Sequence, residues 1–192
     1  MGAYELRVTG KPAHAGLDYQ KGASAIAELA KQIARMEGFT DLKRGVTVNV
    51  GVIRGGTRTN VVAGEAVAEV DVRVQRPADA RSLERKFRAL KPFDRRCRLD
   101  VSGGLERPPM LRSAAGARLY GLAKGVGRSL GLDLKEAAVG GGSDGNFTAA
   151  LGIPTLDGLG GVGEGAHARH ECVLVAELPR RAALLAGLIE AI

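Results

Sequence analysis

The residues best suited to chemistry lie in a glycine-rich segment, residues 139–171, which holds two of the three histidines of the chain. Three glycines precede Ser143 and Asp144, and the stretch that follows predicts a loop that opens a helix. Backbone N–H groups at such a turn bind anions such as a carboxylate or a phosphate. A second glycine loop presents His167, a residue type that ligates metals and transfers protons. We expect a polar site here, where two neighbouring strand ends bring Ser143 close to His167.

Other interpretations of this segment remain open. Residues 140–145 spell the G-x-G-x-x-G pattern of dinucleotide-binding loops, but no acidic residue ends a strand at the distance that a ribose would require. A histidine in a loop is more often a solvated surface group than a ligand, so His167 alone does not establish a site. His170 and Glu171 are close enough in sequence to chelate a metal together with His167.

The composition favours a soluble protein of one or two domains. The 192 residues are 45% hydrophobic, which suffices for packed cores. We find no signal peptide and no membrane-spanning run, so we expect a cytoplasmic protein without a membrane partner. The net charge of +7 would suit nucleic acid, but the basic residues are scattered and only 4% of residues are aromatic, so we expect no nucleic-acid partner. Cys97 and Cys172 lack metal-site spacing and are expected to be free thiols.

Residues 3–107 carry the pattern of an α+β, ferredoxin-like domain. Alternating apolar residues and helical stripes predict the order strand, helix, strand, strand, helix, strand. In this fold both helices cover one face of an antiparallel sheet. The apolar positions that carry the pattern are 4, 6 and 8; 26, 29, 33 and 36; 46, 48, 50 and 52; 66, 68, 70, 72 and 74; 83, 87 and 90; and 97, 99 and 101.

Residues 108–192 have the texture of part of an α/β domain. The boundary is expected at residues 107–109, because two consecutive prolines do not continue a ladder strand. A helical stripe at 119, 122, 126 and 130 precedes a predicted strand at 134–139. A further short strand, a strand at 173–175 and a final helix with its stripe at 178, 182, 185 and 189 complete the prediction.

Three segments of this second part carry a family resemblance. GGGSDGN at 140–146, IPTLDGLG at 153–160 and GAHARHE at 165–171 resemble the end of the catalytic domain in zinc-dependent metallopeptidases, the family of aminoacylases, glutamate carboxypeptidases and succinyl-diaminopimelate desuccinylases. In the first part, GKPAHAG at 10–16, TNVV at 59–62 and VDVR at 70–73 resemble the lid, or dimerisation, domain of the same family. The resemblance covers essentially the whole chain in the same order.

The resemblance implies amide hydrolysis by a water activated on two zinc ions. It makes His167 a metal ligand, and it makes His14 an oxyanion donor that acts across a homodimer interface, with Asn60 beside it. It also implies substrate-carboxylate binding by Arg73, by Gly141, Gly142 and Ser143, and, as a weaker candidate, by Arg107.

Each of these residues also has a structural explanation. His14 would serve equally as a surface residue, Asn60 as a turn former, and Arg73 as a partner of Asp71 or Glu69 on its strand.

The other metal ligands of the family are missing from this sequence. No histidine is followed two residues later by Asp, and no two Glu are adjacent. A single histidine does not hold zinc against water, since catalytic sites use about three protein ligands. We therefore expect the C-terminal part of such an enzyme, without its N-terminal half, inactive alone and binding zinc weakly or not at all. The alternative is a non-catalytic dimerisation module. An RNA-binding ferredoxin-like domain is disfavoured because the third strand has no aromatic residue for base stacking.

Overall fold

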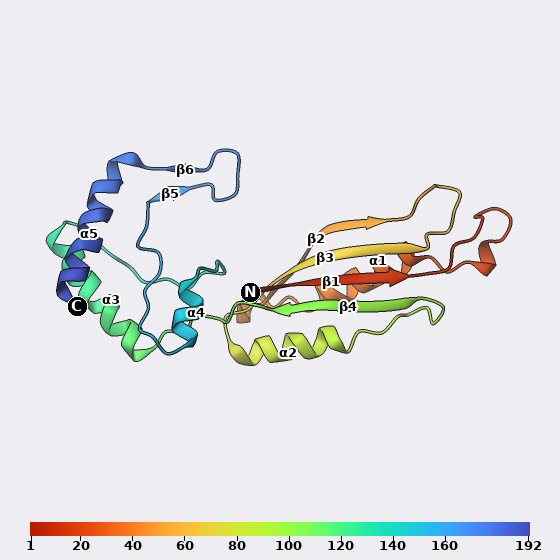
Figure 1. Ribbon diagram of the computed structural model, residues 1–192, viewed down its shortest axis with the longest axis horizontal. Coiled ribbons are helices and arrows are strands. Elements are labelled where there is room, and N and C mark those ends of the chain that lie inside the picture. The colour runs from red at the N-terminus through yellow and green to blue at the C-terminus, as the bar shows by residue number, and fades with distance from the viewer. The chain divides into compact units, whose positions relative to one another are not determined.

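The chain divides at its proline pair into two units, Met1–Pro109 and Met110–Ile192. This division and the elements of each unit are seen in the computed structural model, which describes all of residues 1–192 (Figure 1). Each unit is described by itself below. None of the helices combines the length and the apolar character needed to cross a membrane.

The first unit is an α+β fold built on a four-stranded antiparallel sheet. The strands lie in the order β2-β3-β1-β4, and each neighbouring pair is antiparallel. The elements follow one another along the chain as β1 (Gly2–Thr9), α1 (Ala25–Glu37), β2 (Thr47–Gly55), β3 (Glu65–Arg73), α2 (Pro77–Arg88) and β4 (Arg98–Leu105). The central strands β1 and β3 are therefore paired on both sides, and β2 and β4 are the edges.

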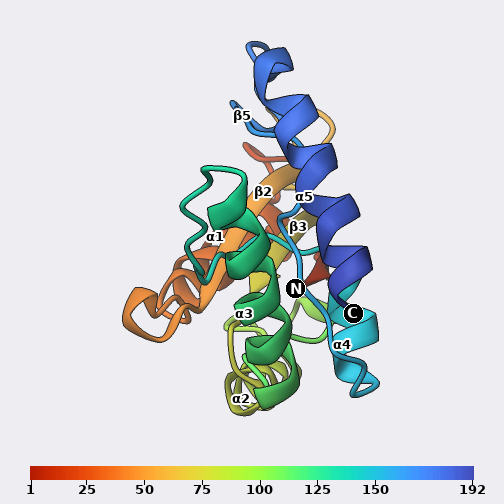
Figure 2. The same cartoon turned by 90° about the vertical axis from the view of Figure 1, so that its left-hand side faces the viewer.

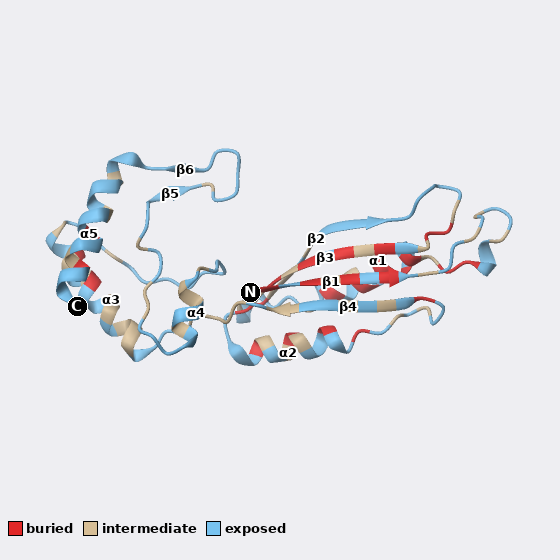
Figure 3. Cartoon of the chain, in the orientation of Figure 1, coloured by how far each residue is buried: buried red, intermediate tan, exposed pale blue.

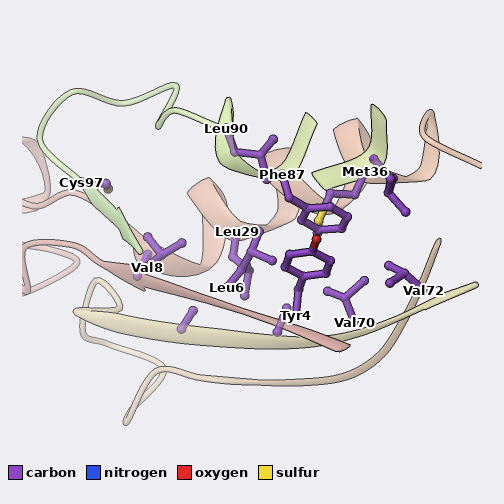
Figure 4. Close-up of a cluster of buried hydrophobic side chains, with 14 of the residues drawn as sticks. Tyr4, Leu6, Val8, Leu29, Met36, Val70, Val72, Phe87, Leu90 and Cys97 are labelled. Atoms are coloured by element: carbon purple, nitrogen blue, oxygen red, sulfur yellow. The ribbon is translucent and has the colours of Figure 1, made fainter. Parts of the chain in front are cut away.

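One face of this sheet forms the hydrophobic core. Tyr4, Leu6 and Val8 alternate with exposed residues along β1, and all three are buried, as predicted. Helices α1 and α2 cover them, and the ring of Tyr4 stacks on Phe87 of α2 with the ring centroids 3.9 Å apart (Figure 4). Leu83 of α2 is also buried, as its helical spacing predicts.

The other face of the sheet is polar. Arg7 pairs with Glu5 and Glu65, and Arg54 pairs with Glu69 across neighbouring strands. The only aromatic residue in the four strands, Tyr4, points to the core instead. This face therefore offers no ring on which a base could stack.

Two predicted core positions of the first unit are wrong. A bulge between Val50 and Val52 places Val52 opposite Glu69, on the polar face, so the predicted alternation stops at Gly51. Ile26 of α1 is exposed, and the polar residues Glu28 and Gln32 are buried in its place. The helix is thus rotated so that its inner face includes two hydrogen-bonding side chains.

The second unit contains three α-helices, a 3-10 turn at Val175–Glu177 and one short hairpin. Its elements are α3 (Ala114–Ser129), α4 (Gly145–Ala150), β5 (Gly163–Glu164), β6 (Cys172–Val173) and α5 (Leu178–Ala191). Helices α3 and α5 lie side by side (Figure 2) and bury Ala123, Gly127, Leu184 and Leu188. These small and branched side chains allow a close approach of the two helices.

Several predictions for the second unit are wrong. Residues 134–139 form no strand, and the further short strand predicted before the second glycine loop does not form either, because the unit has no neighbouring strand to satisfy their N–H and C=O groups. The strand predicted at 173–175 ends at Val173. The stripe predicted for α5 is largely exposed, with Ile189 74% accessible, because the helix turns Leu184 and Leu188 toward α3 instead.

The second unit consequently exposes much of its apolar surface. Most of its residues are accessible, in contrast to the first unit, where buried residues line the sheet and both helices (Figure 3). The exposed large apolar side chains include Leu122, Phe147, Leu151, Ile153, Val173, Leu185 and Ile189. So extensive an apolar surface is typical of a polypeptide that packs against further protein.

Candidate functional site

The loop that carries His14 is held against the segment that carries Asn60. The His14 loop, residues 10–22, follows β1, and the Asn60 segment, residues 56–64, joins β2 to β3. The N–H of Gly10 donates to the carbonyl of Gly64 (2.8 Å), and the N–H of Val62 donates to that of Ala13 (2.9 Å). These bonds continue the β1-β3 pairing beyond the strand ends, so the two segments form one support.

His14 and Asn60 are neighbours at this end of the sheet. The N–H of Ala15 donates to the backbone carbonyl of Asn60 (2.9 Å), and His14 forms a β-bridge with Val61. The Nδ1 atom of His14 accepts hydrogen bonds from the N–H groups of Gly16 and of Leu17, each at 3.1 Å. In the neutral imidazole the proton then resides on Nε2. The exposed His14 ring therefore offers an N–H donor to whatever lies in front of the loop.

Arg73 and Arg107 lie at the opposite end of the same sheet. Arg73 is the last residue of β3, and its Nε donates to Asp71 Oδ2 at 2.8 Å, one of the pairings foreseen from the sequence. Arg107 follows β4, and its backbone N–H donates to the carbonyl of Met1 (3.0 Å) just before β1. The pairing register therefore places these two arginines near the start of β1 and His14 with Asn60 beyond its end; Figure 1 shows both ends of this strand.

The length of β1 separates these two groups. β1 has 8 residues, and at about 3.3 Å per residue the ends of the sheet are roughly 23 Å apart. A small amide substrate does not span that distance. The two groups therefore cannot form one site within a single chain.

The predicted anion site at the start of α4 is largely closed by its own residues. Ser143 Oγ accepts from the N–H of Gly145 (3.2 Å), and the N–H of Ser143 donates to Asn146 Oδ1 (2.9 Å). α4 itself has only 6 residues. Gly141 and Gly142 are exposed just before this turn. The sheet edge that was predicted to join Ser143 to His167 is absent, because neither the strand at 134–139 nor the further short strand forms.

His167 lies at the tip of the β5-β6 hairpin in an unusual backbone conformation. Its φ is +67°, and it is the only residue other than glycine with a positive φ. This left-handed conformation costs about 1 kcal/mol in a residue with a Cβ. The N–H of His167 donates to Glu171 Oε2 at 3.1 Å, which helps to hold the turn. Backbone strain of this kind clusters at functional sites, so His167 stays a candidate functional residue.

The residues present do not form a zinc site. No group of three or more His, Cys, Asp or Glu side chains is arranged to hold a metal ion. Glu171 is engaged with the backbone of its own loop, which leaves His167 without the further ligands that zinc requires. Zinc, which the resemblance implies, therefore does not fit the residues of this chain alone. Both cysteines are free, Cys97 buried and Cys172 exposed, and burial raises the pKa of the Cys97 thiol.

Sequence reasoning missed a group of residues behind the His14 loop. Arg96 donates to the carbonyls of Gln20 and Gly22 and forms an ion pair with Asp94. The hydrogen bonds from Arg96 lower the pKa of the Asp94 carboxyl to about 2. The buried carboxylate of Glu28 accepts from the backbone N–H of Asp94. The one sequence signal for this group was Glu28, an acidic residue beside the apolar stripe of the helix predicted around residues 26–36.

Comparison with known proteins identifies the first unit. The sequence model of the peptidase dimerisation domain matches residues 1–91. The chain carries an M20 peptidase dimerisation domain. It is 28% identical to carboxypeptidase G2 of Pseudomonas sp. (strain RS-16) over 194 residues, 96% of this chain and 46% of that protein. It is 30% identical to the uncharacterized protein YqjE of Bacillus subtilis (strain 168) over 188 residues, 95% of this chain and 49% of that protein.

The similarity extends to solved structures and to the second unit. A tripeptidase from Staphylococcus aureus matches 99% of this chain and 51% of its own with a TM-score of 0.73 and 26% identity. The chain is therefore homologous to carboxypeptidase G2 and to M20 family peptidases along almost all of its length. It spans about half the length of the relatives it matches.

The dimerisation domain has two sheet edges of different character. Beside β2 a groove of about 270 Å³ lies between this strand and α1, lined by residues that include Ile33 and Val50. Ile53 of β2 is 63% exposed and Val52 39%. The strand at the other edge, β4, exposes Arg98, Asp100 and Ser102. Charged edges resist pairing with other strands, whereas an apolar edge favours it.

Proposed function

We propose that this chain supplies the dimerisation domain, residues 3–107, and the closing part of the catalytic domain, residues 108–192, of a hydrolase that cleaves amide bonds of N-acyl amino acids or C-terminal glutamate-type substrates. The observation that carries the proposal is the joined pair of His14 and Asn60. The Nε2–H of His14 and the side-chain amide of Asn60 are the donors that a tetrahedral oxyanion needs. Homology to a carboxypeptidase supports this reaction class.

The arginines at the other end of the sheet suit the substrate carboxylate. Arg73 has the planar fork that binds a carboxylate with two hydrogen bonds, and Arg107 lies at the same end. In the proposed enzyme Ser143 and the amides of Gly141 and Gly142 hold the same end of the substrate. Because the two groups are roughly 23 Å apart in one chain, we propose that His14 and Asn60 serve the site of a partner subunit.

A zinc site in this enzyme requires residues outside these 192. We propose that His167 contributes one ligand to it and that the chain alone is inactive, with zinc bound weakly or not at all. The exposed apolar surface of the second unit supports this proposal, because the rest of a catalytic domain would cover it.

We propose that the homodimer forms through the β2 edge. Pairing of two β2 strands would extend the sheet across a two-fold axis and would cover Val52 and Ile53. The variant Ile53→Arg should be monomeric by light scattering, whereas Ser102→Arg on β4 should remain dimeric. A wild-type chain that is monomeric at high concentration, or a dimer broken only by Ser102→Arg, would exclude this interface.

The catalytic proposal is tested by restoring the missing half. A chimera joins the part of carboxypeptidase G2 that precedes its dimerisation domain to this chain, and hydrolysis of N-acyl glutamates is measured. His14→Ala should lower kcat about a hundredfold, the usual loss for one oxyanion donor, while His170→Ala serves as the control. Mixing the His14→Ala chimera with a His167→Ala chimera should restore activity in heterodimers.

The outcomes separate catalysis from the module alternative. Full activity of His14→Ala, without complementation on mixing, would assign His14 to the surface. A chimera that is folded, dimeric and zinc-loaded but hydrolyses no substrate would favour the non-catalytic dimerisation module.

A further inference from the structure

We propose that Arg96 is a positioning residue for His14, because its guanidinium ties the far side of the His14 loop, residues 20–22, through Asp94 to the buried Glu28 of helix α1. The proposal rests on the proposed function only in that the positioned group is the oxyanion donor. Arg96, Asp94 and Glu28 form a continuous set of contacts from α1 to the loop.

The guanidinium of Arg96 donates hydrogen bonds both to the His14 loop and to Asp94. Nη1 donates to the carbonyls of Gly22 (2.8 Å) and Gln20 (3.2 Å) on the far side of the loop. Nε and Nη2 donate to the two carboxylate oxygens of Asp94 at 3.1 and 2.8 Å. A bidentate pair of this kind fixes the plane of the guanidinium and hence the direction of its remaining N–H groups.

Asp94 is itself fastened to the core. The backbone N–H groups of Phe93 and Asp94 donate to the two oxygens of Glu28, each at 2.9 Å. Glu28 is only 2% exposed, and it also accepts from Gln32 Nε2 at 2.7 Å. The connection therefore runs from α1 through the turn at residues 93–94 to Arg96 and ends on the loop.

The far side of the loop is not packed onto α1. A cavity of about 380 Å³, lined by Tyr19, Gln20, Ala27, Lys31 and other residues, lies between the two. Tyr19 is 67% exposed, so its ring does not anchor the loop. Gly22 is buried against Val62, and its N–H donates to the carbonyl of Tyr19 (3.1 Å). The Arg96 bonds to the carbonyls of Gln20 and Gly22 add to these contacts on the side that faces the cavity.

A displacement of residues 20–22 would be transmitted to His14 through two hydrogen-bonded turns. The N–H of Lys21 donates to the carbonyl of Asp18 (2.9 Å), and the N–H of Asp18 donates to the carbonyl of His14 (3.0 Å). The amides of Gly16 and Leu17, which hold His14 Nδ1, lie within the same stretch. Loss of the Arg96 bonds would loosen these amides and release the Nε2–H from its fixed direction.

The first test uses the 192-residue chain and hydrogen exchange. In Arg96→Gln, amides of residues 13–22 should exchange about tenfold faster, the factor that corresponds to one lost hydrogen bond, while those of β1 and α1 keep the wild-type rate. Arg96→Lys, which keeps the charge but not the fork, should show a smaller increase. The neighbouring exposed Arg95→Gln is the matched control. Unchanged exchange in the loop, or equal acceleration in β1, would overturn the proposal.

The second test follows His14 directly by ¹⁵N NMR of the imidazole. The wild-type chain should show one tautomer with the proton on Nε2, and Arg96→Gln should show a mixture of both tautomers. In the active chimera Arg96→Gln should lower kcat about tenfold with KM unchanged. An unaltered tautomer in Arg96→Gln refutes positioning. Inactivity of every chimera, wild type included, refutes the proposed function instead and leaves the NMR result standing.

Discussion

Replacement of Glu28 should destabilise the first unit more than any other change of a charged side chain on α1. Glu28→Ala removes the acceptor for the N–H groups of Phe93 and Asp94, while Gln32 keeps its bond to the carbonyl of Lys91 (2.9 Å). A hydrogen bond to a charged group contributes about 1.5–3 kcal/mol, and water in the adjoining cavity would replace part of it. The expected loss in the free energy of unfolding is therefore about 3 kcal/mol.

The same site allows a graded comparison. Glu28→Gln retains one carbonyl acceptor and should lose about half as much, roughly 1.5 kcal/mol. Exchange of the Leu6 amide in β1 reports this free energy in the full chain, because central strands exchange only on unfolding. Glu37→Ala, at an exposed position on the same helix, should change it by less than about 0.5 kcal/mol. A loss below about 1 kcal/mol in Glu28→Ala would refute the assignment of Glu28 as the anchor of this turn.

Three further predictions concern the metal, a glycine and pH. After dialysis the chain should retain no zinc by metal analysis, and one or two tightly held ions per chain would contradict the ligand assignment. Gly103→Ala should destabilise the sheet by about 2 kcal/mol in thermal unfolding, because φ is +92° and a Cβ would lie 2.2 Å from the carbonyl oxygen of Ala3; Gly104→Ala, with open space around it, is the control. Arg96 lowers the pKa of Asp94 from 3.8 to about 2. The stabilisation of the fold by the Arg96–Asp94 pair is therefore complete above pH about 4 and is lost as the pH falls toward 2. Exchange of the amides of Lys21 and Gly22, which donate to the carbonyls of Asp18 and Tyr19 and not to the His14 ring, should, once corrected for intrinsic rates, therefore be constant from pH 7 to 4 and accelerate below about 3.

The local patterns of the first unit were sufficient to predict its central elements. β1 and β3 alternate apolar and polar residues, and α2 carries Leu83 and Phe87 at helical spacing. In each element this pattern predicts which face is buried. The short motifs around His14, Asn60 and His167 resemble those of a metallopeptidase family, and the homology to M20 family peptidases confirms that resemblance.

Tertiary structure decided what depends on pairing between distant segments. The bulge at Gly51 turns Val52 away from the core, and the burial of Glu28 depends on two amide groups more than sixty residues later in the chain. The predicted strand at 134–139 fails because its hydrogen bonds need a neighbour that this chain does not provide. Register places His14 beside Asn60 and Arg73 a sheet length away, since antiparallel pairing assigns positions along a strand that no local pattern records.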